Sequence, residues 1–136
     1  MMQTEDWMID AVADVPGVRH VLVTSADGLV RARSAKIARE IAETVGAACA
    51  GLYSLGLSVG TQFESEFGGG SGSAELVMIR FEGWFLFVRR AADGSRLAVV
   101  TDSTVDAAVI GQQMALQVKK IGRSLGTAPR QASAAT

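Results

Sequence analysis

The stretch "ELVMIRFEGWFLFVRRAADGSRLAVVT", residues 75–101, decides the fold of this chain. It holds three apolar runs, at residues 75–81, 84–90 and 96–101, which are separated by the short joints "EG" and "ADGS". Joints of this length suit hairpins, so the three runs are predicted to form an antiparallel meander. The middle run contains the nearly all-apolar "WFLFV", which indicates a strand that is covered on both faces.

A long helix is predicted upstream of this meander, from Ala35 to about Gly60. Its apolar residues recur at steps of three and four, as one side of a helix requires: Ile37, Ile41, Val45, Ala48, Leu52, Leu55 and Val59. The opposite side begins polar and then becomes small and apolar, at Ala47, Ala50, Ser54 and Leu57. A helix that is apolar all round must be covered on both sides. The sheet of one small domain covers one side, so the other side is expected to require a second subunit.

The flanking segments supply the remaining elements. Residues 4–17 predict a short amphipathic helix, and residues 18–34 predict a hairpin around the turn "ADG". A last helix is predicted from Ser103, which has Asp106 three residues later as in a capping box, and Gly126 is placed to end it. The order is therefore helix, two strands, helix, three strands, helix.

These elements are expected to form a single domain over residues 1–126. The 136-residue chain is 49% apolar and 20% charged, a composition that supports a packed core. Residues 127–136 are small and polar without periodicity, and they are expected to form a flexible C-terminal tail.

Charge and composition argue against nucleic acid and membrane partners. The 13 basic residues balance 14 acidic ones, form no basic block and do not alternate with aromatic residues. Residues 44–63 carry no charge, but their glycine, serine and threonine content makes them a poor membrane span, so membrane insertion is not expected. The N-terminal stretch has acids where a secretory signal needs cations, so the chain is predicted to be cytoplasmic.

No residue pattern predicts catalysis, a cofactor or a metal ion. His20 and Cys49, the single histidine and the single cysteine, fall in a predicted strand and in the predicted long helix. The glycine-rich stretch "GGGSGS", residues 68–73, lacks the lysine of a P-loop and leads into a strand rather than a helix. It is expected to be a flexible approach to an edge strand, where glycines permit bulges. The sequence therefore predicts a protein that is not an enzyme.

Several phrases and the order of the elements coincide with a known group. The phrases are "WMIDAVADVPGVRHVLVTSADGLVRARS", "AETVGAACAGLYSLG", "FGGG", "GWFLFVRRAADGSRLAVVT" and "IGQQMALQVKKIGRSLG". Together, over about residues 5–126, they resemble the roadblock/dynein light chain family, and within it the bacterial (actinobacterial) branch of the gliding-motility type. The resemblance implies an α/β fold of the α+β type, profilin/longin-like, with the order α-β-β-α-β-β-β-α. Its five-stranded antiparallel sheet lies between the second helix and the first and last helices.

The resemblance also implies a homodimer in which the second helices pack together and the third strands meet edge to edge. Mapped onto this chain, the interface is expected to contain Val45, Gly46, Cys49, Ala50, Tyr53, Leu57, Leu76, Met78 and Arg80. Gly46 and Ala50 are small enough to let two helix backbones approach. The implied dimer agrees with the need to cover an apolar helix and an open strand edge.

In function, the resemblance implies a non-catalytic regulatory scaffold that binds a small Ras-like GTPase of bacterial type. It either stimulates GTP hydrolysis without donating an arginine or only docks the GTPase. The implied signalling module includes a sensor-kinase-like protein, so partners are a route to membrane recruitment. The polar first turns of the long helix are the candidate GTPase contact, at Lys36, Arg39, Glu40 and Glu43.

Two alternatives to this function stay open. One is a small-molecule-sensing module of similar sheet-and-helix architecture, although the expected lining of its pocket is aliphatic. The other is intrinsic nucleotide hydrolysis without a partner, against which the missing P-loop argues.

Overall fold

The computed structural model describes residues 6–134, with side chains over residues 7–123. Its helices are η1 (Asp6–Met8), α1 (Asp10–Ala13), α2 (Arg39–Phe63), η2 (Ala92–Gly94) and α3 (Ala107–Ala134). Its strands are β1 (Val18–Thr24), β2 (Val30–Arg33), β3 (Leu76–Phe81), β4 (Trp84–Arg90) and β5 (Arg96–Asp102).

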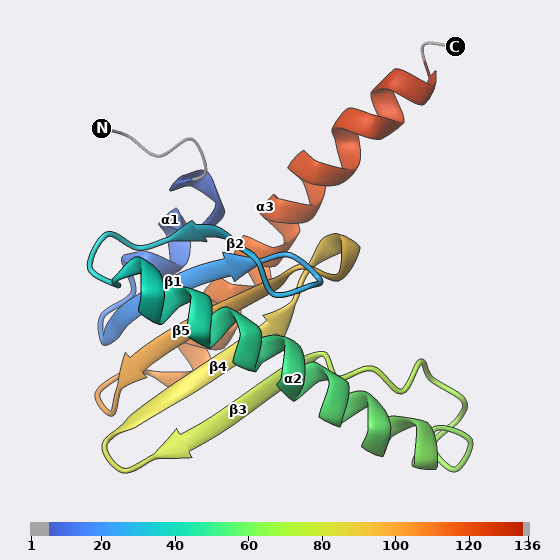
Figure 1. The fold of residues 1–136 in the computed structure, drawn as a ribbon, viewed down its shortest axis with the longest axis horizontal. Helices are drawn as coiled ribbons and strands as arrows, with labels where there is room; N and C mark the ends of the chain where they lie inside the picture. The colour runs from blue at the N-terminus through green and yellow to red at the C-terminus, as the bar shows by residue number, and fades with distance from the viewer. Residues whose placement is uncertain (1–5, 135–136) are drawn as a thin grey trace.

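The five strands form one antiparallel sheet in the order β2-β1-β5-β4-β3. α2 covers one face of the sheet, and α1 and α3 cover the other (Figure 1). The C-terminal turns of α2 extend past the edge of the sheet (Figure 1). The predicted α+β fold with a five-stranded antiparallel sheet is confirmed.

Two apolar clusters hold the helices against the sheet. On one face, Val21 of β1 packs in the cluster that contains Ile110 and Met114 of α3. On the other face, Leu22 and Val88 pack beneath α2. Adjacent strand residues such as Val21 and Leu22 point to opposite faces, and burying an aliphatic side chain of this size contributes about 1.5–3 kcal/mol. The sheet is therefore held from both sides.

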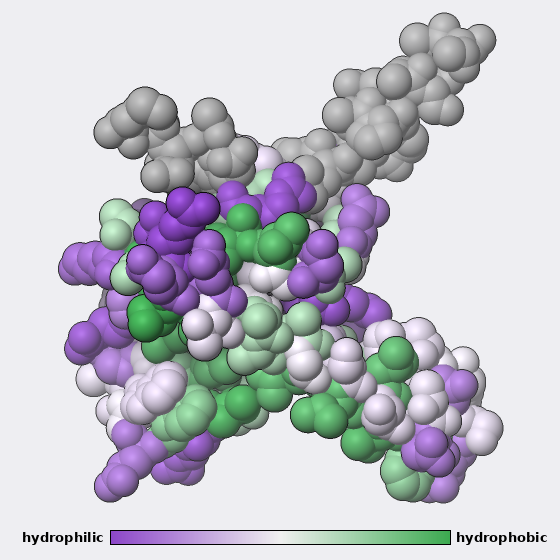
Figure 2. All heavy atoms as spheres, in the orientation of Figure 1, coloured by the Kyte–Doolittle hydropathy of each residue, from purple (hydrophilic) through white to green (hydrophobic). Residues whose placement is uncertain are grey.

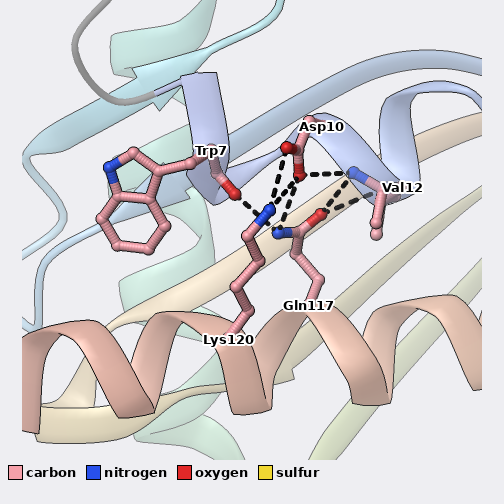
Figure 3. Close-up of polar contacts among 6 residues, drawn as sticks. Trp7, Asp10, Val12, Gln117 and Lys120 are labelled. Atoms are coloured by element: carbon pink, nitrogen blue, oxygen red, sulfur yellow. Dashed lines mark hydrogen bonds and ion pairs between the residues drawn. The ribbon is translucent and has the colours of Figure 1, made fainter.

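A buried glutamine joins the N-terminal helix to α3 (Figure 3). The side-chain oxygen of Gln117 accepts hydrogen bonds from the backbone N–H groups of Ala11, at 2.9 Å, and Val12, at 3.1 Å. Its side-chain nitrogen donates to the carbonyl oxygen of Trp7 at 2.9 Å. Gln117 thus provides the N–H groups in the first turn of α1 with a hydrogen-bond acceptor that lies outside the helix. The single helix predicted over residues 4–17 is accordingly divided into η1 and the short α1 within the described residues.

An ion pair at the surface supports the same contact. Lys120 of α3 lies 2.9 Å from the carboxylate of Asp10 (Figure 3). Burial disfavours the charged form of Asp10, but the hydrogen bonds from Lys120 and from the backbone of Ala11 outweigh it and lower the pKa of this carboxyl. The ionised form of Asp10 is therefore favoured by folding.

The glycine-rich segment returns the chain along α2 toward β3. Gly68 and Gly72 have positive φ angles of 95° and 77°, a region that favours glycine. Gly72 lies so close to the helix that a Cβ atom on Gly60 would be 1.8 Å from its carbonyl oxygen. β3 then pairs with β4 without a register shift over its whole length. The bulge expected at this strand does not occur, because the glycines reverse the chain before the strand begins.

Both predicted ends of the last helix are wrong. The carboxylate of Asp106 accepts the N–H groups of Ala108 and Val109, at 3.0 and 3.2 Å, so Asp106 rather than Ser103 caps α3. α3 also continues through Gly126 to Ala134. A glycine inside a helix costs only about 1 kcal/mol relative to alanine, which does not by itself end the helix. The flexibility of residues 127–136 stays a prediction, and residues 135–136 lie outside the described residues.

Candidate interaction surface

The inner side of α2 consists of small residues and one tyrosine that lie on the sheet. Ala42, Gly46, Cys49 and Tyr53 are all buried. A Cβ atom on Gly46 would lie 2.7 Å from the carbonyl oxygen of Gly28, so the helix touches the β1–β2 turn at this point. Burial raises the pKa of the Cys49 thiol to about 11, although the charge of an arginine on β5 partly opposes the shift. The small residues therefore serve close packing within the chain.

Most of the large apolar residues of α2 lie on a different side of the helix. Together with Ala48 they form the apolar stripe, which comprises Ile41, Val45, Ala48, Leu52, Leu55, Val59 and Phe63. Their spacing of three and four residues places them in one row along the helix. Leu55 and Val59 in this row are 66% and 62% exposed. Contiguous apolar surface of this kind marks an interaction site in soluble proteins.

The neighbouring end of the sheet adds aromatic surface. Phe81 and Trp84 stack with ring centroids 3.9 Å apart at the turn between β3 and β4, and both are exposed. Figure 2 shows hydrophobic residues along α2 and over the adjacent part of the sheet, with a notch between the end of α2 and the β3–β4 hairpin. The stripe and the hairpin therefore border one apolar concave surface.

β3 is one of the two outer strands of the sheet, and within the described residues it pairs with β4 alone. Met78 lies opposite Phe87, which belongs to the cluster on the α3 side, so Met78 points to that face. Leu76, Met78 and Arg80 are exposed there because α3 does not cover β3. The strand thus presents unpaired backbone groups and apolar side chains together.

The predicted dimer residues divide into two groups in the structure. Leu57, Leu76, Met78 and Arg80 are exposed, and Val45 and Ala50 are half-buried. Gly46, Cys49 and Tyr53 are buried against their own sheet in the lone chain, and their place in a dimer interface stays a prediction. The burial of Gly46 has a steric reason, because only a residue this small lets α2 lie so close to the β1–β2 turn.

Sequence reasoning also missed the exposure of the apolar stripe. The regular spacing of Ile41, Leu55 and Val59 is a signal for one helix side, but it does not state whether that side faces the sheet. The glycines and alanines on the adjacent side were the available signal for close packing within the chain.

The candidate GTPase contact residues lie at the start of α2 and just before it. Arg39 and Glu43 form an exposed ion pair at 3.2 Å, and Glu40 and Lys36 are also exposed. Arg39 and Glu43 border a hollow of about 740 Å³ together with the β1–β2 hairpin, which contributes Asp27, Arg31 and Arg33. The structure thus brings Arg39 and Glu43 together with further charged groups from the hairpin.

The described residues offer limited chemistry elsewhere. Over residues 7–123, where side chains are described, no group of three or more His, Cys, Asp or Glu side chains is placed to hold a metal ion. His20 lies in β1 as predicted, half-buried, with an Nδ1 atom that has no hydrogen-bond partner. Among the described helices, α2 is long and apolar enough to cross a membrane by length and composition.

Comparisons with known proteins give one family and one fold. The family model of the Roadblock/LC7 domain matches residues 5–101. A Roadblock/LC7 domain from Streptomyces avermitilis superposes with a TM-score of 0.79 at 33% identity, over 91% of this chain and 98% of that one. No curated protein matches the sequence.

Two more distant structures share the fold alone. The gliding protein MglB from Thermus thermophilus superposes with a TM-score of 0.74 at 15% identity, over 90% of this chain and 92% of that one. Profilin II from Acanthamoeba castellanii has a TM-score of 0.53 at 15% identity, over 85% of this chain and 95% of that one.

Proposed function

Because this chain belongs to the Roadblock/LC7 family, we propose that it is a non-catalytic regulatory protein that works as a homodimer and binds a small Ras-like GTPase. The observation that carries the proposal is the apolar stripe of α2 beside an open strand edge. The fold likeness to the gliding protein MglB supports a GTPase partner of the bacterial type.

A homodimer would cover the apolar stripe of α2 and the open edge of β3 at the same time. A twofold axis brings the same patch of two subunits together, so a strand edge and a helix row are each paired with their own copy. Two copies of β3 related in this way pair antiparallel, which satisfies their free N–H and C=O groups. The apolar stripe of α2 then lies against the second subunit rather than water. Leu55, Val59 and Met78 are the residues expected to lose most exposed area.

The GTPase contact is assigned to the charged start of α2. Arg39, Glu40 and Glu43 remain outside the apolar stripe, so a dimer formed through the stripe leaves them accessible. The regulator acts by positioning the GTPase's own groups and donates no catalytic residue. In the cell, we place it in the cytoplasm, in a module with a sensor-kinase-like protein that recruits it to the membrane.

Two measurements test the proposal separately. Sedimentation velocity of the purified chain is expected to give a dimer at micromolar concentration. Calorimetry with the small GTPase encoded nearest to this chain, loaded with GDP or with a non-hydrolysable GTP analogue, is expected to show binding in at least one nucleotide state. Arg39→Glu should weaken that binding, while the matched Arg123→Glu on the opposite face of the sheet should not.

The opposing results are equally definite. A monomer at all concentrations removes the dimer. No heat of binding in either nucleotide state removes the GTPase role. Equal affinity of wild type and Arg39→Glu moves the contact away from the start of α2. Adding the chain to a GTP hydrolysis assay then decides between stimulation and docking alone.

A further inference from the structure

A second cavity lies beside α2 at the opposite flank from the apolar stripe. It has a volume of about 330 Å³ and lies between the helix, the η2 turn and the glycine-rich segment. Its polar and aromatic lining comes from Tyr53, Ser54, Ser73, Arg90 and Arg96. This volume is at the lower end of small-molecule pockets, so a ligand of few atoms would fill it.

Two arginines line this cavity, and no carboxylate is among its lining residues. Arg90 of β4 and Arg96 of β5 are direct register partners, so their side chains leave the sheet on the same face. No ion pair joins either of them to an acid within the described residues. Like charges directly opposite in a sheet destabilise it. An anion between the two guanidinium groups would reverse that effect.

Arg96 is held in position by two contacts, and one of its donor atoms is buried without a partner. Its Nη1 atom donates to the carbonyl oxygen of Ala26 at 2.8 Å, and its Cζ atom lies 5.0 Å from the centre of the Tyr53 ring. Its buried Nε atom has no hydrogen-bond partner. A buried donor that lacks a partner carries a desolvation cost, which a rotation of the side chain that exposed Nε to a bound acceptor would remove.

Tyr53 forms the floor of the cavity and is itself fixed. Its hydroxyl lies 2.9 Å from the carbonyl oxygen of Val88 and 3.1 Å from that of Glu75, so it donates to the backbone. Burial raises the pKa of Tyr53, and the charges of Arg96 and Arg90 partly oppose this shift. The ring therefore stays neutral beside the two cations, and the net charge of the lining is set by the arginines.

We propose that this cavity binds a phosphoryl group, with Arg90 and Arg96 as its two cationic ligands. A phosphomonoester carries about −1.5 to −2 charge at neutral pH, which matches two guanidinium groups. Arginine presents its donors in a planar fork that suits phosphate oxygens. The hydroxyls of Ser54 and Ser73 add neutral donors at the rim. This site uses side chains and not a P-loop, and it would add ligand sensing to the regulatory role without depending on it.

The experiment uses the full chain and glycerol 3-phosphate as the probe. Tyr53 is the only tyrosine of the chain, so its ring signals in the NMR spectrum report on the cavity without ambiguity. We expect these signals to shift with millimolar glycerol 3-phosphate, and we expect Arg90→Gln to weaken binding about tenfold or more. Arg123→Gln, with the same change of charge on the far face of the sheet, should bind like wild type. Arg90 makes no side-chain hydrogen bond in the described residues, so Arg90→Gln carries the test even where Arg96→Gln fails to fold.

A parallel arm asks whether the phosphoryl group belongs to a free molecule or to a lipid. Flotation with phosphatidylcholine vesicles that contain phosphatidic acid is compared with phosphatidylcholine alone, for wild type and for Arg90→Gln. If either probe binds wild type and Arg90→Gln abolishes that binding, the result supports the site. The probe that binds then shows whether the phosphoryl group comes from a free molecule or from a lipid. Binding in neither arm overturns the proposal, as does binding that Arg90→Gln leaves unchanged. Equal affinity for succinate, a dicarboxylate of the same charge, overturns the assignment to phosphoryl groups.

Discussion

The substitution Leu55→Ser tests the claim that the apolar stripe is covered by a second subunit. Fully burying a leucine side chain contributes about 2 kcal/mol. Leu55 is 66% exposed in the lone chain, so covering the exposed part contributes about 1.3 kcal/mol for each subunit. A twofold dimer contains the contact twice, which gives about 2.6 kcal/mol, or roughly 80-fold in the dissociation constant.

The matched control is Leu29→Ser. Leu29 is also 66% exposed, but it lies in the turn between β1 and β2 and outside the apolar stripe. Both substitutions exchange the same atoms at the same exposure, and exposed sites change folding stability by only about 0.5 kcal/mol. Leu55→Ser should therefore weaken the dimer, and Leu29→Ser should leave it intact. Sedimentation equilibrium over a dilution series measures the dissociation constant of each variant. Equal dissociation constants for the two variants and wild type would refute the placement of the stripe at the interface.

Three further predictions concern the packing and the charges of the fold. Gly46→Ala should destabilise the chain by about 1–3 kcal/mol in urea unfolding, because its Cβ would lie 2.7 Å from a carbonyl oxygen of the β1–β2 turn. The control Gly111→Ala, with open space around its Cβ, should stabilise the chain by about 1 kcal/mol. Stabilisation by both substitutions would contradict the close contact at Gly46. Gln117→Leu should lower the free energy of unfolding by about 2–4 kcal/mol, because it leaves backbone groups of the N-terminal helices unpaired. The control Gln112→Leu, at an exposed position of α3, should change it little. Equal urea midpoints for the two variants would show that the buried hydrogen bonds contribute nothing. Asp10 has a lowered pKa in the folded chain, so its contribution is present above the unfolded value of 3.8 and is lost as the pH falls through the folded value. At acid pH the urea midpoint of wild type should therefore fall as the pH is lowered, and Asp10→Asn should make this fall less steep. The same pH dependence for both proteins would count against the ion pair.

The order of elements could be predicted from the sequence because periodicity and turns are local signals. The meander over residues 75–101 contains its own hairpin joints, and the structure pairs its strands as those joints require. The ends of the helices were harder to predict. Asp106 caps α3 through its own side chain, whereas Ser103 is three residues closer to β5 and shares the same capping pattern in the sequence. A pattern of residue types does not state which of two nearby caps is used.

The side of α2 that faces the sheet could not be predicted from hydrophobicity. Both sides of the helix are apolar, so a count of apolar residues does not distinguish them. The distinction is one of size: Gly46 fits beneath the carbonyl of Gly28, and a residue such as Leu55 would not. The cavity at Arg90 and Arg96 was missed for another reason, since residues on two strands become neighbours only through the register of β4 and β5.

The overhang of α2 beyond the sheet has a practical consequence for handling this protein. Within the described residues, the glycine-rich segment packs against those last turns but the sheet does not, and a weakly supported stretch of helix is marginal in water. Dilution should fray this end first, so a protease would cut it in a dilute sample and spare it in a concentrated one. The melting temperature would then rise with protein concentration, so values recorded at different concentrations could not be compared directly.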